Sequence, residues 1–437
     1  MLLPFLLAMQ ASARLYVVTT TNDSVGTSCL RGAINSANAH GGNDVILLKG
    51  EMPRSRFAKI PVTAYFCGGL EIKTGQVTII SEARAIIDAS NSGDRVFHVF
   101  PNARLTLQNL IVTGGKAGQN LSFVKGFKGQ GGGGILNEGS LVMDHCVVAE
   151  NAAGDGSIFG YTGTGGDGGD GGGINNAGVM TLNFCLITNN SAGRGSRGDF
   201  PSEGLVLTTA DAGNGGGGGN GGGIYNSGSM LLNACVFKSN QCGNGGNGGD
   251  SYFSNSGNGG AGGNGGGICN EGNFEAKHCQ VMENVSGKGG SGGSAAISRL
   301  GISGSGGNGG VGGGIANVAD AVDAKLFNCL VALNAVGGGG CGGIIVPIPL
   351  IQTSLPTEPI QPKFSRTENP LPPCGVMPSM PSGSDGFAND LFGSFYSRGF
   401  NLIAEDDFSS GFINGNKHDI VGTAASPANP TWFKLIR

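Results

Sequence analysis

The stretch GGDGGDGGGI at residues 165–174 decides the architecture, because its ending recurs along the chain. Three glycines followed by isoleucine end at five positions, Ile135, Ile174, Ile224, Ile268 and Ile315. An asparagine lies two residues after each of them, at Asn137, Asn176, Asn226, Asn270 and Asn317. A cysteine follows eleven residues after the isoleucine in four copies and fourteen in the fifth, at Cys146, Cys185, Cys235, Cys279 and Cys329. A second asparagine lies five residues after each cysteine, so the chain contains a structural repeat.

Each copy has the alternating pattern of short strands. In GSLVMDHCVVAEN (139–151), the apolar residues Leu141, Met143, Cys146 and Val148 are predicted to point inward from two strands with a bend between them. One copy cannot bury its own apolar face, so successive copies must stack, with parallel strands about 4.8 Å apart. We therefore predict an all-β fold, a right-handed single-stranded parallel β-helix, or solenoid.

Stacking gives each repeated residue a predicted role. The isoleucines and cysteines fill the interior, where buried Cys behaves as a small apolar residue. Disulfides between neighbouring coils are the alternative for these cysteines, but free buried thiols are preferred. The asparagines can occupy left-handed turn positions, and their amides can also join in a ladder along the axis. Residues 70–81 and 96–115 predict earlier coils, with Leu110 in the place of the cysteine.

The glycine tracts between the second asparagine and the next repeat are predicted insertions at one corner of the solenoid. Several follow a three-residue pattern, as in GGDGGDGGG, which is the period of a polyproline II helix. Two glycines in every three exclude collagen. Two hypotheses stay open, flexible glycine-rich loops and packed strands of polyglycine II.

Residues 27–42 give the best helix of the chain, with Leu30, Ala33, Ile34 and Ala37 on one face. Thr27 or Ser28 is the expected cap at its start, Gly41 ends it, and the helix should cover the open end of the solenoid. The predicted division is a signal-peptide remnant at 1–13, a strand and capping helix at 14–50, the β-helix with its insertions at 51–343, a proline-rich insertion or linker at 344–397, and a final coil with the C-terminal end at 398–437.

Composition excludes several functional classes. Of the 437 residues, 87 are glycine and only 13% are charged, and the formal net charge is -4. This is not the basic footprint of a nucleic-acid-binding protein. Apart from the apolar start of the chain, which is assigned to a signal peptide, no stretch approaches the roughly 18 apolar residues of a transmembrane helix.

The repeats GGGI-x-N…C-x-x-x-x-N resemble those of the polymorphic outer-membrane-protein type, with its GGAI and FxxN motifs. The segment TSCLRGAINSANA (27–39) resembles the CSLREA-type segment of bacterial secreted β-helix proteins, although Gly32 replaces the expected Glu and Ser and Cys are swapped in order. Residues 401–423 are similar to the end of choice-of-anchor surface proteins. The resemblance implies a bacterial secreted or surface-exposed β-helix, for which adhesion is the usual suggestion.

The acidic residues and histidines of the repeats are candidates for catalysis or metal binding, and the alternative is that they are solvated surface groups. A polysaccharide hydrolase would need two carboxylates about 5–10 Å apart. The acidic residues are scattered instead of repeated, at Glu138, Asp144, Glu150, Glu271, Glu275, Glu283, Asp406 and Asp407. Asp167 and Asp170 only partly match a calcium-binding nonapeptide. His145 and His278 lie beside column cysteines, but adjacent strand residues point to opposite faces, which argues against zinc.

No catalytic, cofactor-binding or metal-binding residue is therefore predicted, and no cofactor. The expected function is a secreted or cell-surface scaffold of the adhesin-like kind, with a polysaccharide lyase or hydrolase on the same fold as the alternative. The expected partners are surface glycans or other extracellular proteins, without nucleic acid. The glycine-rich edge is the expected contact surface.

Overall fold

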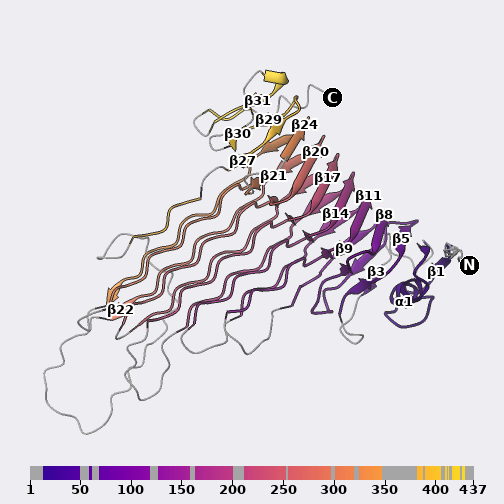
Figure 1. Cartoon of the computed structure of the whole chain (residues 1–437), viewed down its shortest axis with the longest axis horizontal. Coiled ribbons are helices and arrows are strands. Elements are labelled where there is room, and N and C mark those ends of the chain that lie inside the picture. The colour runs from indigo at the N-terminus through magenta and orange to yellow at the C-terminus, as the bar shows by residue number, and fades with distance from the viewer. Residues whose placement is uncertain are drawn as a thin grey trace, which may run out of the picture.

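The chain winds into a three-sided parallel β-helix in which each full coil adds one strand to each of three sheets. The arrows of these sheets and the long traces that extend from them are seen in Figure 1. The structure is a computed structural model that describes residues 13–49, 59–61, 68–118, 126–157, 163–199, 211–251, 254–296, 301–318, 324–346, 381–386, 389–404, 409–410, 412, 416–423 and 426–428. The predicted signal-peptide remnant lies almost wholly outside these residues. The parallel β-helix is confirmed, and its right hand stays a prediction.

The three sheets are named in the order in which a coil visits them. Sheet 1 contains β4 (Leu70–Ile72), β7 (Phe97–Val99), β10 (Ile135–Asn137), β13 (Ile174–Asn176), β16 (Ile224–Asn226), β19 (Ile268–Asn270), β23 (Ile315–Asn317), β27 (Leu391–Ser394) and β30 (Ser409–Ser410). Sheet 2 contains β1 (Leu15–Val18), β2 (Asn43–Leu48), β5 (Gln76–Ser81), β8 (Arg104–Gln108), β11 (Ser140–Asp144), β14 (Val179–Asn183), β17 (Ser229–Asn233), β20 (Asn273–Lys277), β24 (Ala324–Phe327) and β28 (Tyr396–Ser397). Sheet 3 contains β3 (Lys59–Pro61), β6 (Ile86–Asp88), β9 (Ile111–Thr113), β12 (Val147–Ala149), β15 (Leu186–Thr188), β18 (Val236–Lys238), β21 (Gln280–Met282), β25 (Leu330–Ala332), β29 (Leu402–Ile403) and β31 (Ile420–Val421). The prediction of two strands per copy was incomplete, because the Ile-x-Asn segment is a third strand.

The register places equivalent residues above one another. The five repeat isoleucines are Cα partners from coil to coil, and Phe97 and Leu391 extend their file at either end. The five repeat cysteines form a second file, since the residue after each donates its N–H to the carbonyl of the preceding cysteine, or of Leu110 at the start. Leu141, Met143, Cys146 and Val148 are all buried, as predicted. The interior is therefore one continuous apolar core.

Both repeat asparagines are buried and form amide ladders along the axis. In sheet 1, Asn137 donates from Nδ2 to Asn176 Oδ1 at 2.6 Å, and the pattern continues to Asn317. The second ladder starts at Asn151, with Nδ2–Oδ1 distances of 2.9 to 3.0 Å, and ends on Asp390 at 2.8 Å. The ladder hypothesis is confirmed. Because the interior offers no water, each ladder fixes the register of every coil it crosses.

The left-handed turn positions are occupied by other residues than these asparagines. The residue before each cysteine has φ between 49° and 57°, and it is His145, Phe184, Ala234, His278 or Asn328. The residue before the second asparagine has φ between 53° and 63°, and it is Glu150, Asn189, Ser239, Glu283 or Leu333. The turn hypothesis for the repeat asparagines was wrong, because their amides are needed inside, and the bend is made one residue earlier.

Helix α1 (Leu30–His40) covers the first coil, as predicted. It buries Leu30, Ala33, Ile34 and Ala37, and Gly41 ends it with φ 67°. The predicted cap by Thr27 or Ser28 was wrong, because Cys29 takes the N-cap position, and its side chain does not hydrogen-bond to the N–H groups of the first turn. Among the described residues, no helix has the length and apolar character to span a bilayer.

Two contacts fix this helix to the solenoid. The buried Arg31 guanidinium pairs with Asp23 at 2.7 Å and donates to the carbonyls of Gly68 and Gly69 at the start of the first full coil. A Cβ at Gly32 would lie 2.1 Å from the carbonyl oxygen of Gly26. This close approach explains why no Glu occupies position 32.

The glycine tracts form a two-layered slab beside the three sheets, seen as the undulating traces in Figure 1. Outgoing strands, such as 151–157 and 190–199, leave sheet 3, and returning strands, such as 163–173 and 211–223, lead back to sheet 1. At the far end, β22 (Ala295–Ala296) pairs with β26 (Ile345–Val346). The described residues of the tracts are hydrogen-bonded strands, so the packed-strand hypothesis is confirmed over the flexible-loop hypothesis.

Each position of the three-residue pattern has its own hydrogen-bonding direction. The first glycine donates within its layer to the next coil, as Gly168 does to the carbonyl of Gly217 at 2.9 Å. The second donates to the other layer, as Gly219 does to Gly193 at 2.8 Å. The third residue carries a side chain at most positions, exposed at Asp167 and buried at Asp170. Hydrogen bonds in several directions with a period of three are expected of polyglycine II.

The backbone N–H of the third residue has no carbonyl partner in this pattern, and Asp or Asn at the third position of the preceding coil accepts it. The Oδ1 atom accepts the backbone N–H of the third residue in the next coil, at distances from 2.6 Å (Asp167 to Gly217) to 3.2 Å (Asn255 to Ile302). The same contact links Asn214 to Asn258 and Asn244 to Lys288. The frequency of Asx in the tracts therefore follows from backbone hydrogen bonding.

The coil structure resumes at residue 381, before the sequence-based boundary at 398. Residues 381–386 continue the returning layer, with Gly309 donating to the carbonyl of Ser384 at 2.8 Å. Strands β27 and β28 then complete a coil on β23 and β24. A short 3-10 helix, η2 (Asn416–His418), precedes β31. Residues 347–380, with most of the prolines, lie outside the described residues.

Candidate functional site

Three of the carboxylates considered for hydrolysis contact a neighbouring side chain. Glu138 contacts His98 Nε2 at 2.7 Å, and Glu271 accepts from the hydroxyl of Tyr225 at 2.6 Å. Burial, with this hydrogen bond, raises the pKa of Tyr225, so its hydroxyl stays a donor. Glu283 pairs with Lys238 at 3.2 Å.

Glu138 and Glu271, which share a column of the repeat, are not neighbours along the axis. Glu138 and Glu271 lie at equivalent turns, but the coils of Ala177 and Ser227 separate them. Asp144 lies beside His145 at 3.1 Å, and Glu150 is at an exposed turn. Asp406 and Asp407 lie outside the described residues.

The aspartates and histidines considered for calcium and zinc make other contacts. Asp167 and Asp170 use Oδ1 to cap the N–H groups of Gly217 and Asn220, and Asp170 also pairs with Lys128. His145 is exposed and Cys146 is buried, and both lie in the turn between β11 and β12. Within the described residues, no three His, Cys, Asp or Glu side chains come close enough to hold a metal ion.

The repeat cysteines are free buried thiols, as predicted. The same holds for Cys242, which lies where sheet 3 meets the slab, and burial raises its pKa to about 12. A thiol reacts with an alkylating reagent only as the thiolate, so the reaction requires that the thiol ionises and that the reagent reaches the sulfur.

We expect iodoacetamide at mildly alkaline pH to leave Cys242 and the five file cysteines unmodified in the native protein. All six should react after denaturation, which is the control. Peptide mass spectrometry after labelling checks this prediction. Rapid labelling of Cys235, in the middle of the file, in native protein would contradict the buried file.

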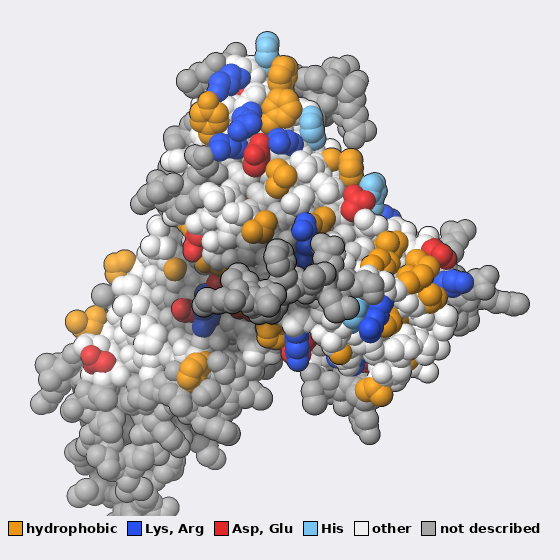
Figure 2. Space-filling model, turned by 45° about the vertical axis from the view of Figure 1, so that its right-hand side comes forward, with side chains coloured by type: hydrophobic (Ala, Val, Ile, Leu, Met, Phe, Trp, Pro, Cys, Tyr) orange, Lys and Arg blue, Asp and Glu red, His pale blue; other side chains and the backbone are white. Residues whose placement is uncertain are grey.

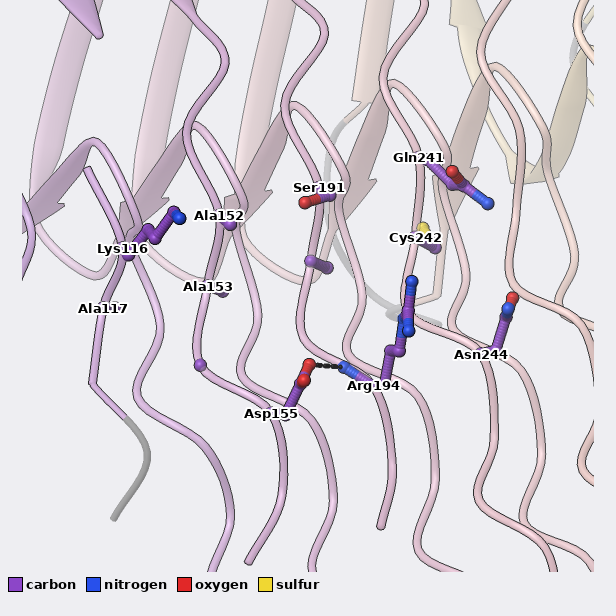
Figure 3. A pocket seen from close by; sticks show the side chains of 12 residues that line it. Lys116, Ala117, Ala152, Ala153, Asp155, Ser191, Arg194, Gln241, Cys242 and Asn244 are labelled. Atoms are coloured by element: carbon purple, nitrogen blue, oxygen red, sulfur yellow. Dashed lines mark hydrogen bonds between the residues drawn. The ribbon is translucent and has the colours of Figure 1, made fainter. Parts of the chain in front are cut away.

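A first groove lies where the outgoing layer of the slab meets sheet 3 (Figure 3). It measures about 430 Å³ and crosses four coils. Its floor consists of small buried residues from successive coils, namely Ala117, Ala153, Ala192 and Cys242. Lys116, Arg194 and Gln241 stand at its rim, and the backbone N–H of Arg194 donates to Asp155 Oδ1 at 2.7 Å.

A second groove, of about 400 Å³, lies on the outer face of sheet 2 and crosses β14, β17, β20 and β24. Most of the outward-facing residues that line it are uncharged, namely Val179, Thr181, Ser229, Leu231 and Asn273. The two charged residues, Glu275 and Lys325, lie at its C-terminal end. Hydroxyl and amide groups therefore alternate with apolar side chains along an axial path.

A cluster of cations and aromatic rings adjoins the second groove at the C-terminal end. We call it the C-terminal patch, and it contains Lys277, His278, Lys325, Phe327, Tyr396, Arg398, Phe400, Lys417 and His418. Figure 2 shows blue, pale-blue and orange side chains gathered at this end, at the top of the view. The residues come from four successive coils, so the sequence alone did not reveal the cluster. The only sequence signal was the His or Phe that precedes some repeat cysteines.

Comparison with protein-family models, with curated proteins and with solved structures found no match for this chain. The candidate site is therefore defined by its geometry alone. It consists of two grooves that cross successive coils, one of which leads to the C-terminal patch.

Proposed function

We propose that the protein is an extracellular or cell-surface scaffold that acts as an adhesin-like module. The observation that carries this proposal is the course of the two grooves. Both are built from equivalent residues of neighbouring coils, so each offers a repetitive surface along the axis. A repetitive surface suits an extended ligand with repeating units better than a single small molecule, which is usually enclosed in a concave pocket.

The rigidity of the scaffold also supports this role. Two amide ladders, the apolar core and the hydrogen-bonded slab hold the coils from Asn137 to Asn334 in register. A preorganised face loses little conformational freedom on binding, which favours affinity. The resemblance of the repeats to polymorphic outer-membrane-protein repeats supports a bacterial surface location, as does the apolar start of the chain.

The alternative is a polysaccharide lyase or hydrolase on the same fold. The carboxylates whose contacts are described above bind cations, hydroxyls or backbone N–H groups instead of facing one another across a groove. This arrangement favours binding over cleavage.

A glycan array combined with a depolymerisation assay tests the proposal. We expect the full chain to retain one class of glycan, and no shorter products to appear on prolonged incubation. Release of oligosaccharides would establish the enzyme instead, and heat-denatured protein is the control for contaminating activity.

A further inference from the structure

We propose that the C-terminal patch, together with the groove on sheet 2, binds an anionic polysaccharide. The acidic groups of the glycan contact the cations of the patch, and its sugar rings lie on the exposed aromatic side chains. This inference rests on the proposed adhesin-like role and names its partner.

The first observation is the charge of the patch. Lys277, Lys325, Arg398 and Lys417 gather at one end of a chain whose net charge is -4. Glu275 Oε1 lies 3.1 Å from Lys277 Nζ and 3.6 Å from an Arg398 nitrogen, so two cations share one carboxylate. Among these described side chains, four cations lie near one carboxylate, and this balance is complementary to an anionic ligand.

The second observation is the arrangement of rings beside these cations. Phe400 stacks on His418 at 4.8 Å and meets Phe327 edge-to-face at 6.2 Å. Lys417 Nζ lies 4.5 Å from the ring centre of Tyr396. Tyr396 is 57% exposed and Phe400 is 46% exposed. Exposed aromatic residues next to cations are typical of binding surfaces.

The third observation is that turn formation does not explain these rings. Phe400 and His418 have φ of 60° and 64°, and His278 has φ of 57°. Asn328 occupies the same turn in the coil between those of His278 and Phe400, with φ of 49°. Asn tolerates this conformation far better than Phe. Strained residues of this kind cluster at functional sites. His145 and Phe184 hold the same turn in earlier coils and stack on one another, so the rings of the patch continue a file of rings along the axis.

The fourth observation is the continuity of the patch with the groove on sheet 2. Lys325 belongs to both, and it lies between Glu275 and Tyr396 in the register of the strands. Farther along the groove, Thr181, Ser229 and Asn273 offer uncharged hydrogen-bonding groups that suit sugar hydroxyls. A nucleic acid would require cations along the whole path, to contact successive phosphates. The composition of the groove therefore favours a glycan.

The test uses the full chain immobilised in a binding assay at several salt concentrations. The probes are polygalacturonate, heparin, neutral dextran and single-stranded DNA. The main variant combines Lys325→Ala with Lys417→Ala. The matched control is Lys73→Ala, because Lys73 is also an exposed lysine near an aromatic ring, 6.0 Å from the centre of Phe100, and pairs with Glu71 at 2.7 Å.

We expect polygalacturonate or heparin to bind, dextran to bind weakly, and salt to weaken the charged interaction. Each lysine removed should weaken binding about fivefold, and the double variant about 25-fold. Tyr396→Ala should weaken it about tenfold or more. Lys73→Ala should bind like the original protein. Hydrogen exchange of the original protein with and without glycan should show protection at residues 324–327 and 396–400, which tests the site without any variant.

Three results would overturn the proposal. The first is equal binding of anionic glycans by the original protein and the double variant, and the second is tighter binding of DNA than of either anionic glycan. The third is binding of neutral glycans or of cells that is equally strong in the patch variants. This result would leave the adhesin-like role intact. If the original protein retains no glycan and adheres to no cell surface, the proposed function and this inference both fail.

Discussion

Gly219→Ala is expected to destabilise the slab by about 3 kcal/mol or more. A Cβ at this position would lie 2.0 Å from the carbonyl oxygen of Gly169, in the backbone of the neighbouring coil. The strands would have to separate, and two hydrogen bonds between the layers would be lost, namely Gly219 to Gly193 at 2.8 Å and Gly243 to Gly219 at 3.0 Å. Backbone atoms on both sides leave no flexible group that could give way.

Gly217→Ala is the matched control, two residues away in the same strand. A Cβ there would meet Asp167 Oδ1 at 3.4 Å and Ala261 O at 3.8 Å, which are ordinary contacts. We expect a change within about 0.5 kcal/mol, or a small gain from reduced freedom of the unfolded chain.

Urea denaturation and hydrogen exchange of the slab amides measure both effects. Exchange at Gly193 and Gly243 should accelerate in the Gly219 variant and stay slow in the control. Equal stability of the two variants would contradict the packed slab.

Asn240→Ala is expected to lower the free energy of unfolding by about 3 kcal/mol. The buried Asn240 amide donates to Ile187 O and to Asn284 Oδ1, both at 2.9 Å. Its Oδ1 accepts the backbone N–H of Asn190 at 3.1 Å and Nδ2 of the same residue at 3.0 Å. The substitution leaves groups on both neighbouring coils without partners, at a depth where water does not replace them.

Asn233→Ala supplies the control from the same coil. Asn233 faces outward at the end of β17, where its Nδ2 donates to Asn183 Oδ1 at 2.8 Å in a partly exposed position. Its loss should lower the free energy of unfolding by less than about 1 kcal/mol, because water can take its place. Equal losses for the two variants, measured by urea denaturation, would show that the ladder adds no more than a surface hydrogen bond.

The repeat pattern predicted the interior correctly because burial depends on spacing alone. Because five isoleucines and five cysteines recur in the same order, only stacking buries them all, and the files of Ile135 and Cys146 follow. The capping helix was predictable because Leu30, Ala33, Ile34 and Ala37 form one apolar face. The turns were predicted less well, because the repeat asparagines serve the ladders and the bend falls on residues such as His145.

The sequence by itself determined the coil and the files within it, since these depend on a pattern repeated along one chain. Only the tertiary structure decided how the glycine tracts bond to one another and which side chains meet at the C-terminal end. Lys277, Lys325, Tyr396 and Lys417 are up to 140 residues apart in the chain, and they approach because each coil rises only about 4.8 Å. A contact between coils depends on the length of every intervening insertion, and that length has no period from which the contact can be predicted.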